Sequence, residues 1–177
     1  MIDKIIYLKY NYKYINMENL KKDIEIQIKR AYFDLIEEHV NSNPPDFDWI
    51  IKLYSEIVGR MTVFLKRDST LRQKIISDMD IELFSQIVKN DAFNSKDMKG
   101  LVEYTFSTMV MLGSPARDKE TNDMKNQVLE LANNSKTTFG EIVSLYLKNT
   151  HICLDNYHID FENAIKNDIK LEYLKNL

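Results

Sequence analysis

The sequence predicts an all-α fold, a single helical domain of about seven helices behind a short strand-like or disordered N-terminal tail. Apolar residues recur mostly at intervals of three and four, which is the spacing of an amphipathic helix. The 177 residues include only 4 Gly and 3 Pro, so few positions can break a helix. A chain of this length is close to the usual size of one domain. We therefore assign residues 1–16 to the tail and residues 17–177 to one all-helical domain.

The tail is set apart because its pattern is not helical. From Ile5 to Tyr14, tyrosines alternate with Asn and Lys, and a period of two is typical of a β-strand. A lone strand needs a second chain or a loop to pair with, so the tail is a candidate for self-association or for capturing a partner by strand addition. The alternative is a flexible tail, which we favour because chain ends are commonly disordered unless they are tied down.

The first two helices are separated by a polar segment, residues 41–48, that contains two consecutive prolines. The first helix is predicted from about Met17 to Val40, with one apolar stripe along it. The stripe consists of Leu20, Ile24, Ile28, Ala31 and Leu35. The second helix is predicted to begin at Asp46 or Asp48 as its N-cap. Its inward-facing residues are Ile50, Tyr54, Ile57, Met61 and Phe64.

Three helices follow a polar elbow at residues 66–70. A short helix is predicted from Leu71 and another from Asp80, and Ser95 is the predicted cap of the next one. The sixth helix begins at Ser114–Pro115, since Ser suits an N-cap and Pro suits the first helical position.

The last long helix is predicted from a capping box. Thr138 and Glu141 have the spacing at which each side chain bonds the other residue's backbone N–H. Residues from Asp160 onward either extend this helix or add one more.

Composition excludes several classes of protein. The hydrophobic content of 44% and the charged content of 29% are typical of a soluble globular protein and argue against wholesale disorder. A net charge of −3 with no basic half predicts no nucleic-acid partner. No apolar run has the length of a membrane span. The single cysteine suits a reducing compartment, so we expect a cytoplasmic protein, in the host cytoplasm if the source is viral.

The most informative segment is the junction between the fifth and sixth helices. An apolar helical run stops at Gly113 and a new helix begins at Ser114 and Pro115, which places Arg117 and Asp118 in its first turn. The sequence therefore predicts a helix corner that carries an ionic group.

Arg117 is interpreted mainly as structural and secondly as part of a partner-binding surface. Arginine cannot act as a base at ordinary pH, and no His or Cys is nearby in the sequence. We expect Arg117 to pair with a carboxylate on another helix, Glu56 or Glu103.

Five blocks of the sequence, in the same order, resemble the T-complex-protein-eleven-like family. The corner is similar to that family's Leu-Cys-Ala-Pro-Val-Arg-Asp-Glu string, with Gly113–Ser114 in place of its Cys-Ala. The other similar blocks are Lys29–Asp34, Pro44–Ile57, Leu71–Leu83 and Leu154–Ile159. Larger members of the family continue well beyond the point at which this sequence ends.

The resemblance implies a non-enzymatic helical module that binds one or more proteins, a regulator or adaptor in signalling linked to cyclic AMP and its protein kinase. It implies no cofactor. The alternative is a structural or self-assembling protein, for instance of a large DNA virus, that forms homo-oligomers through its tail. Phe47 and Trp49 form a candidate partner surface, although we favour the interpretation that they are a staple that fixes the entry of the second helix.

No strong catalytic signature is present. The sequence lacks a glycine-rich phosphate loop, a Gly-x-Ser-x-Gly elbow and paired-cysteine zinc spacing. His151, Asp155 and His158 share one helix face, but three ligands on one helix need a fourth from elsewhere, so we predict no metal site. Cys153 is interpreted as a small core residue. Ser69 follows two basic residues, as basophilic kinases prefer, and is also a good N-cap.

Overall fold

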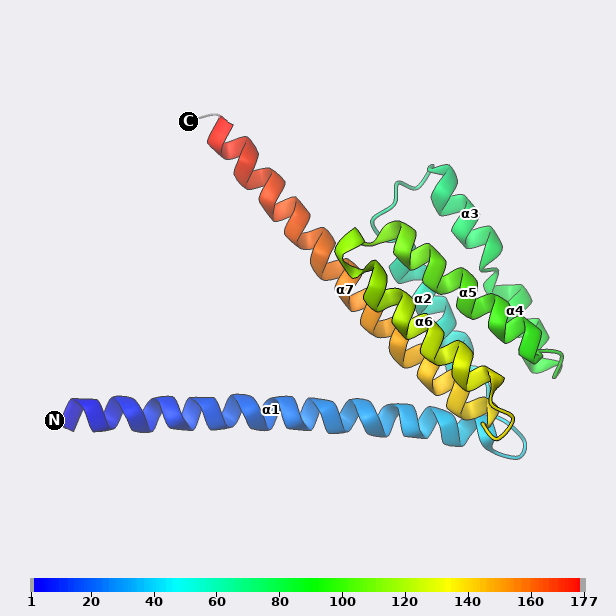
Figure 1. Ribbon diagram of the computed structural model, residues 1–177, viewed down its shortest axis with the longest axis horizontal. Helices are drawn as coiled ribbons and strands as arrows, with labels where there is room; N and C mark the ends of the chain where they lie inside the picture. Colours follow the sequence, from blue (N-terminus) through cyan, green and yellow to red (C-terminus); the bar gives the residue numbers. More distant parts are fainter. Residues whose placement is uncertain (1, 176–177) are drawn as a thin grey trace.

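The structure is a computed structural model that describes the backbone of residues 2–175 and the side chains of residues 17–168 (Figure 1). These residues form seven α-helices, one 3-10 helix and no strand, which confirms the predicted all-α class. In chain order the elements are α1 (Ile2–Asn41), α2 (Asp48–Thr62), α3 (Thr70–Asp78), α4 (Ile81–Lys89), α5 (Ser95–Leu112), the 3-10 helix η1 (Pro115–Arg117), α6 (Asp118–Asn133) and α7 (Phe139–Lys175).

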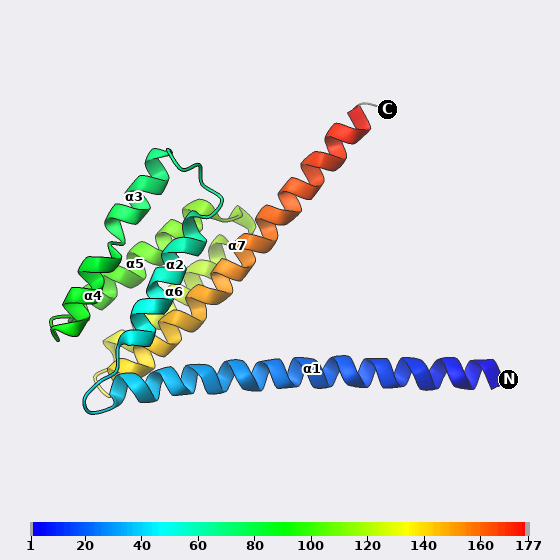
Figure 2. The ribbon, with the colours of Figure 1, turned by 180° about the vertical axis from the view of Figure 1, so that it is seen from behind.

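The central element is α7. It contacts α1, α2, α5 and α6, while α3 and α4 pack against α2. The end of α1 and the beginning of α7 lie side by side, and the two helices diverge from that joint (Figures 1 and 2). The N-terminal half of α1 and the C-terminal end of α7 therefore project beyond the helical body in both views.

The joint between α1 and α7 is fixed by Asn41. Its Oδ1 accepts a hydrogen bond from the Gly140 N–H at 3.1 Å, and its Nδ2 donates to Thr138 Oγ1 at 3.2 Å. A Cβ at position 140 would lie 2.5 Å from Asn41 Nδ2, so any residue other than glycine there would displace the Asn41 side chain from these bonds. The predicted capping box is confirmed, since Thr138 N–H donates to Glu141 Oε2 at 2.6 Å and Glu141 N–H to Thr138 Oγ1 at 3.2 Å.

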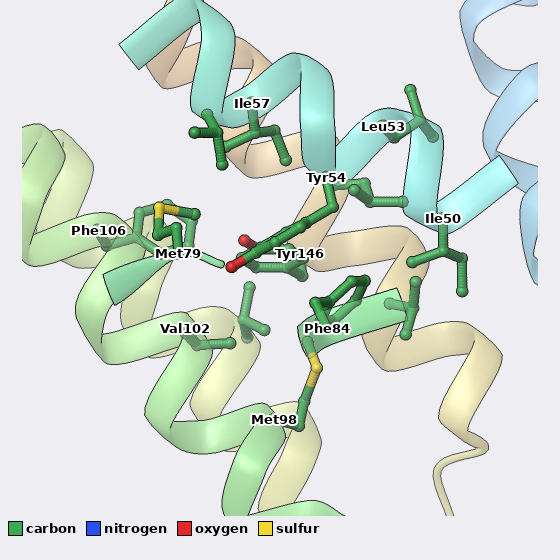
Figure 3. Close-up of a cluster of buried hydrophobic side chains, with 14 of the residues drawn as sticks. Ile50, Leu53, Tyr54, Ile57, Met79, Phe84, Met98, Val102, Phe106 and Tyr146 are labelled. Carbon is green, nitrogen blue, oxygen red and sulfur yellow. The ribbon is translucent and has the colours of Figure 1, made fainter. Parts of the chain in front are cut away.

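The core lies where α2, α4, α5 and α7 meet (Figure 3). The ring of Tyr54 stacks on that of Phe84, with centroids 4.1 Å apart. The buried hydroxyls of Thr105 and Tyr146 share a hydrogen bond at 3.0 Å, so these two polar groups satisfy each other inside the core. Four of the five inward residues predicted for the second helix are buried, namely Ile50, Tyr54, Ile57 and Met61.

The strand-like interpretation of the N-terminal segment is wrong for residues 2–16, whose backbone continues α1. Extending an existing helix requires no new nucleus, and Ile, Leu, Lys and Tyr tolerate a helical backbone. The side chains of residues 1–16 are outside the described residues. The flexible-tail alternative and the domain boundary at residue 17 stay predictions.

The apolar stripe predicted for the first helix is present but does not face the core. Its five residues are exposed, with exposed fractions of 59% for Leu20, 48% for Ile24, 63% for Ile28 and 48% for Leu35, and with Ala31 also exposed. The helix contacts the body through a different face near its C-terminal end, formed by Tyr32, Phe33, Ile36 and Val40. Helical spacing predicts that an apolar stripe exists, but it does not identify which surface covers the stripe.

Two predicted helix caps are also corrected. The residue before α2 is Phe47, whose ring has no hydrogen-bond acceptor and so makes no side-chain cap. Asp46 instead accepts the Asp48 N–H in a turn just outside the helix, at 3.0 Å. The cap of α5 is Asn94 rather than Ser95, and Asn94 forms a capping box with the third residue of the helix. Asn and Ser are both good N-caps, so the sequence leaves a one-residue ambiguity there.

Candidate functional site

The predicted helix corner lies between α5 and α6. Gly113 has an extended backbone, Ser114 precedes the 3-10 turn Pro115–Arg117, and α6 begins at Asp118. After Gly113 the chain therefore forms a 3-10 turn first and an α-helix only from Asp118. Ser114 makes no side-chain cap bond. A Cβ at Gly113 would lie 2.9 Å from the Met109 carbonyl oxygen, so the close approach of the chain at this corner favours glycine.

Arg117 binds two carboxylates at this corner. Its Nε donates to Asp160 Oδ2 at 2.8 Å and its Nη2 to Asp160 Oδ1 at 3.4 Å, while Nη1 donates to Glu120 Oε2 at 3.3 Å. The predicted partners Glu56 and Glu103 are wrong, because the side chain extends from η1 toward the C-terminal half of α7 rather than toward α2 or α5. With 35% of Arg117 and 26% of Asp160 exposed, this pair is only half-buried. Its loss is therefore less costly than that of a buried ion pair.

A groove opens beside this ion pair, between the end of α5 and the C-terminal half of α7. Its volume is about 420 Å³. Its lining combines apolar with polar residues, namely Leu112, Gly113, Ser114, Tyr157, Asp160, Phe161, Asn163, Ala164 and Asn167. Asp160, Asn163 and Asn167 recur at intervals of three and four, so they form a polar row along one face of α7.

The second predicted surface, Phe47 with Trp49, is divided by the fold. Phe47 packs against the core, whereas Trp49 is 44% exposed and carries the Lys52 ammonium 5.2 Å from its ring centroid. Phe47 directly precedes α2 and Trp49 is its second residue, so the two rings lie on different sides of the helix start. Only Trp49 is left as an exposed aromatic residue at this place.

His151, Asp155 and His158 come together as their spacing predicts, but around Arg60. Arg60 Nη1 donates to His151 Nδ1 at 3.1 Å and Nη2 to Asp155 Oδ1 at 2.6 Å, and His158 Nε2 donates to the Arg60 carbonyl at 3.2 Å. A guanidinium cation thus occupies the face on which a metal ion would have to bind. No cluster of three or more ligating side chains occurs among the described residues.

Two other residues singled out in the sequence have structural contacts. Cys153 is buried against Met124 and Thr121, and burial raises the pKa of its thiol to about 11, so it is a poor nucleophile at neutral pH. Ser69 is the N-cap of α3, because its Oγ accepts the Arg72 N–H at 3.2 Å. Modification of Ser69 stays a prediction.

Sequence reasoning missed Asp160, Asn163 and Asn167 at the groove, and Arg60 beside the histidines. Asp160 is 43 residues from Arg117, and Arg60 is 95 residues from Asp155. No local pattern joins residues so far apart in the chain. The three-and-four spacing of the polar row on α7 was the only signal available, and a solvated helix face shows the same spacing.

Within the described part of the chain, no helix combines the length with the apolar character that crossing a membrane requires.

A family model described as T-complex protein 11 matches residues 1–153. The chain is 25% identical over 115 residues to the T-complex protein 11 homolog of Homo sapiens, and 29% identical over 96 residues to that of Rattus norvegicus. These alignments cover 64% and 54% of this chain but only 22% and 16% of the two relatives. No solved structure matches the chain.

The family match extends through α1 to α6 and well into α7, which includes the corner but ends before Asp160. Because it covers far more than half of the chain, this protein belongs to the T-complex protein 11 family.

Proposed function

We propose that this chain is a non-enzymatic helical module that binds another protein and that, as the family resemblance implies, it acts as a regulator or adaptor in signalling linked to the cyclic-AMP-dependent kinase. We place the binding surface at the groove beside Arg117. The observation that carries the proposal is the open groove of about 420 Å³ at the corner, lined by both apolar and polar side chains.

The chemistry of the groove supports binding of a protein segment. Its volume falls within the range of about 300–1,000 Å³ that is usual for ligand pockets. Leu112 and Phe161 offer apolar surface for an anchoring side chain. The carboxamides of Asn163 and Asn167 can both donate and accept hydrogen bonds, so they suit the backbone groups of a bound segment.

The corner residues support this surface rather than any chemistry. Arg117 holds Asp160 in place through two hydrogen bonds, so that the carboxylate at the groove is oriented before a partner arrives. Ser114, Pro115 and Asp118 set the direction of the turn that carries Arg117. Pre-arranged groups of this kind lower the entropic cost of binding.

The test is a direct titration of the tagged chain against purified catalytic and regulatory subunits of the cyclic-AMP-dependent kinase. Ala164→Arg fills the groove while removing no hydrogen bond, and it should weaken binding by at least about tenfold. Ala92→Arg is the matched control. Ala92 is exposed in the loop that precedes the N-terminal end of α5, whereas the groove lies at the C-terminal end of that helix. This control should bind like the unaltered chain.

Two outcomes would contradict the proposal separately. If the unaltered chain binds neither subunit, the signalling role fails. If it binds and Ala164→Arg binds equally well, the groove is not the docking surface.

A further inference from the structure

The groove beside Arg117 is negatively charged at the corner. Arg117 faces two carboxylates, since it bonds Asp160 at 2.8 Å through Nε and Glu120 at 3.3 Å through Nη1. One guanidinium cannot neutralise two carboxylates, so the corner keeps an excess of negative charge. The described residues that line the groove include no lysine or arginine that would offset this charge. A cleft lined by one sign of charge attracts groups of the opposite sign.

Two further features add negative charge along the groove. The C-terminal end of α5 reaches the groove through Leu112 and Gly113, and α5 has no basic residue in its last turn. The end of a helix carries a partial negative charge, which such a residue would offset. Asp168 is exposed four residues beyond Ala164, so it lies on the face of α7 that lines the groove. This part of α7 continues past the helical body (Figure 1), which leaves the groove open to a partner.

Asp160 can accept hydrogen bonds beyond those from Arg117. A carboxylate offers about four acceptor positions. Arg117 uses one position on each oxygen, at 2.8 and 3.4 Å. Because Asp160 also lines the groove, a cation that enters the groove finds a carboxylate with unused acceptor positions that is already held in place.

An aromatic ring stands beside this carboxylate. Phe161 directly follows Asp160 and lines the groove. Its ring stacks on that of Phe64, with centroids 3.9 Å apart and an interplanar angle of 15°, so Phe161 is held in position from the side of α2. Tyr157 adds a second aromatic ring to the lining. Aromatic rings attract cations, and they also offer apolar surface to the stem of a long side chain.

We propose that the groove receives an arginine side chain of the partner protein, with its guanidinium on Asp160 and its stem against Phe161. This inference rests on the groove being the docking surface proposed above. A guanidinium is planar, binds carboxylates through two N–H groups and stacks on aromatic rings. A lysine ammonium is more strongly hydrated and acts as a point charge, so it suits this combination less well.

The same groups disfavour other kinds of segment. Asp160 and Asp168 repel an acidic or phosphorylated segment. A purely apolar segment would cover Asp160 without supplying donors for its unused acceptor positions, which costs free energy. A segment that carries arginine meets both requirements, since it brings positive charge and hydrogen-bond donors together.

The test is a titration of the isotopically labelled full chain with Nα-acetyl-arginine amide, followed through backbone amide chemical shifts. Nα-acetyl-citrulline amide is the matched probe, because a neutral urea group replaces the guanidinium. The arginine probe should shift the amide signals of Asn163, Ala164 and Asn167 and bind at least about tenfold more tightly than the citrulline probe. Its binding should weaken as salt is added, since the attraction is between charges.

Three variants locate the charge that the arginine probe recognises. Asp160→Asn keeps the shape of the side chain but not its charge, and it should weaken binding by at least about tenfold. Asp168→Asn leaves the pair of Arg117 with Asp160 intact and should weaken binding about threefold. Glu162→Gln is the control, because Glu162 pairs with Lys166 at 3.6 Å on nearly the opposite face of α7. It should bind like the unaltered chain, and unchanged amide spectra of the free variants show that the fold is retained.

The outcomes separate this inference from the docking surface on which it rests. Equal binding of the two probes, no shift of the groove signals by either probe, or full binding by both Asp160→Asn and Asp168→Asn would overturn the arginine site. None of these results concerns the kinase subunits, whose binding to the unaltered chain and to Ala164→Arg decides the docking surface separately.

Discussion

Arg60 fixes the tautomer of His151, and burial keeps the ring neutral. A guanidinium has only donors, so His151 Nδ1 must accept from Arg60 and the ring proton must be on Nε2, which is buried and has no hydrogen-bond partner among the described residues. Burial is the main cause that lowers the pKa of His151 below 6.5, and Arg60 lowers it further against the opposing effect of Glu56. His151 is therefore a neutral structural residue at physiological pH.

The lowered pKa of His151 predicts a loss of stability on acidification. As the pH falls below about 6.5, the unfolded state binds a proton that the folded state resists, so the free energy of unfolding decreases through that window. Above it, His151 is neutral in both states and its contribution is fully present. His151→Gln keeps a neutral acceptor for Arg60 but cannot titrate, and urea titrations between pH 7 and 5 should show a shallower decline for this variant. Identical slopes for the two proteins would contradict the assignment.

Among the helices, the joint between α1 and α7 includes one side chain that bonds the start of α7 twice. Asn41 at the end of α1 bonds Thr138 and Gly140 at the start of α7, and thereby connects residues almost a hundred positions apart. Asn41→Ala should destabilise the protein by about 1 kcal/mol, as the loss of a helix cap does. For a chain of this size the melting temperature should fall by about 2–4 °C in calorimetry.

Asn19→Ala is the control for this prediction. Asn19 is an exposed residue of the same helix, so its replacement removes no contact to the body and slightly improves helix propensity. An equal fall in melting temperature for both variants would mean that Asn41 contributes nothing specific to the joint.

The sequence predicts local features well and long-range ones poorly, for physical reasons that α7 and α1 illustrate. The capping box at Thr138 and the stop at Gly113 follow from bonds within a few residues, and both are present. The pairing of Arg117 with Asp160 depends on how two helices cross, which no local pattern encodes. The stripe on α1 was recognised but its exposure was not, because periodicity identifies an apolar face and not its neighbour.

On the scale of the whole molecule, the chain combines a packed body with a helix that extends beyond it. A helix of 40 residues is about 60 Å long, whereas a compact domain of this chain length has a radius of gyration of about 16 Å. The described core includes no residue before Tyr32. The body and the first part of α1 should therefore differ in local stability.

Truncation tests this division. The described residues from 17 to 30 are all exposed, so removing residues 1–28 should change the melting temperature by no more than about 2 °C at concentrations where the chain is monomeric. Removing residues 1–40 also deletes Ile36 and Val40, which are buried, and should lower it by more than about 5 °C. Hydrogen exchange on the dilute full chain should show the same boundary, with faster exchange before Lys29 than after Tyr32. A large loss of stability in the shorter truncation would instead mean that the N-terminal part of α1 packs against the body in solution.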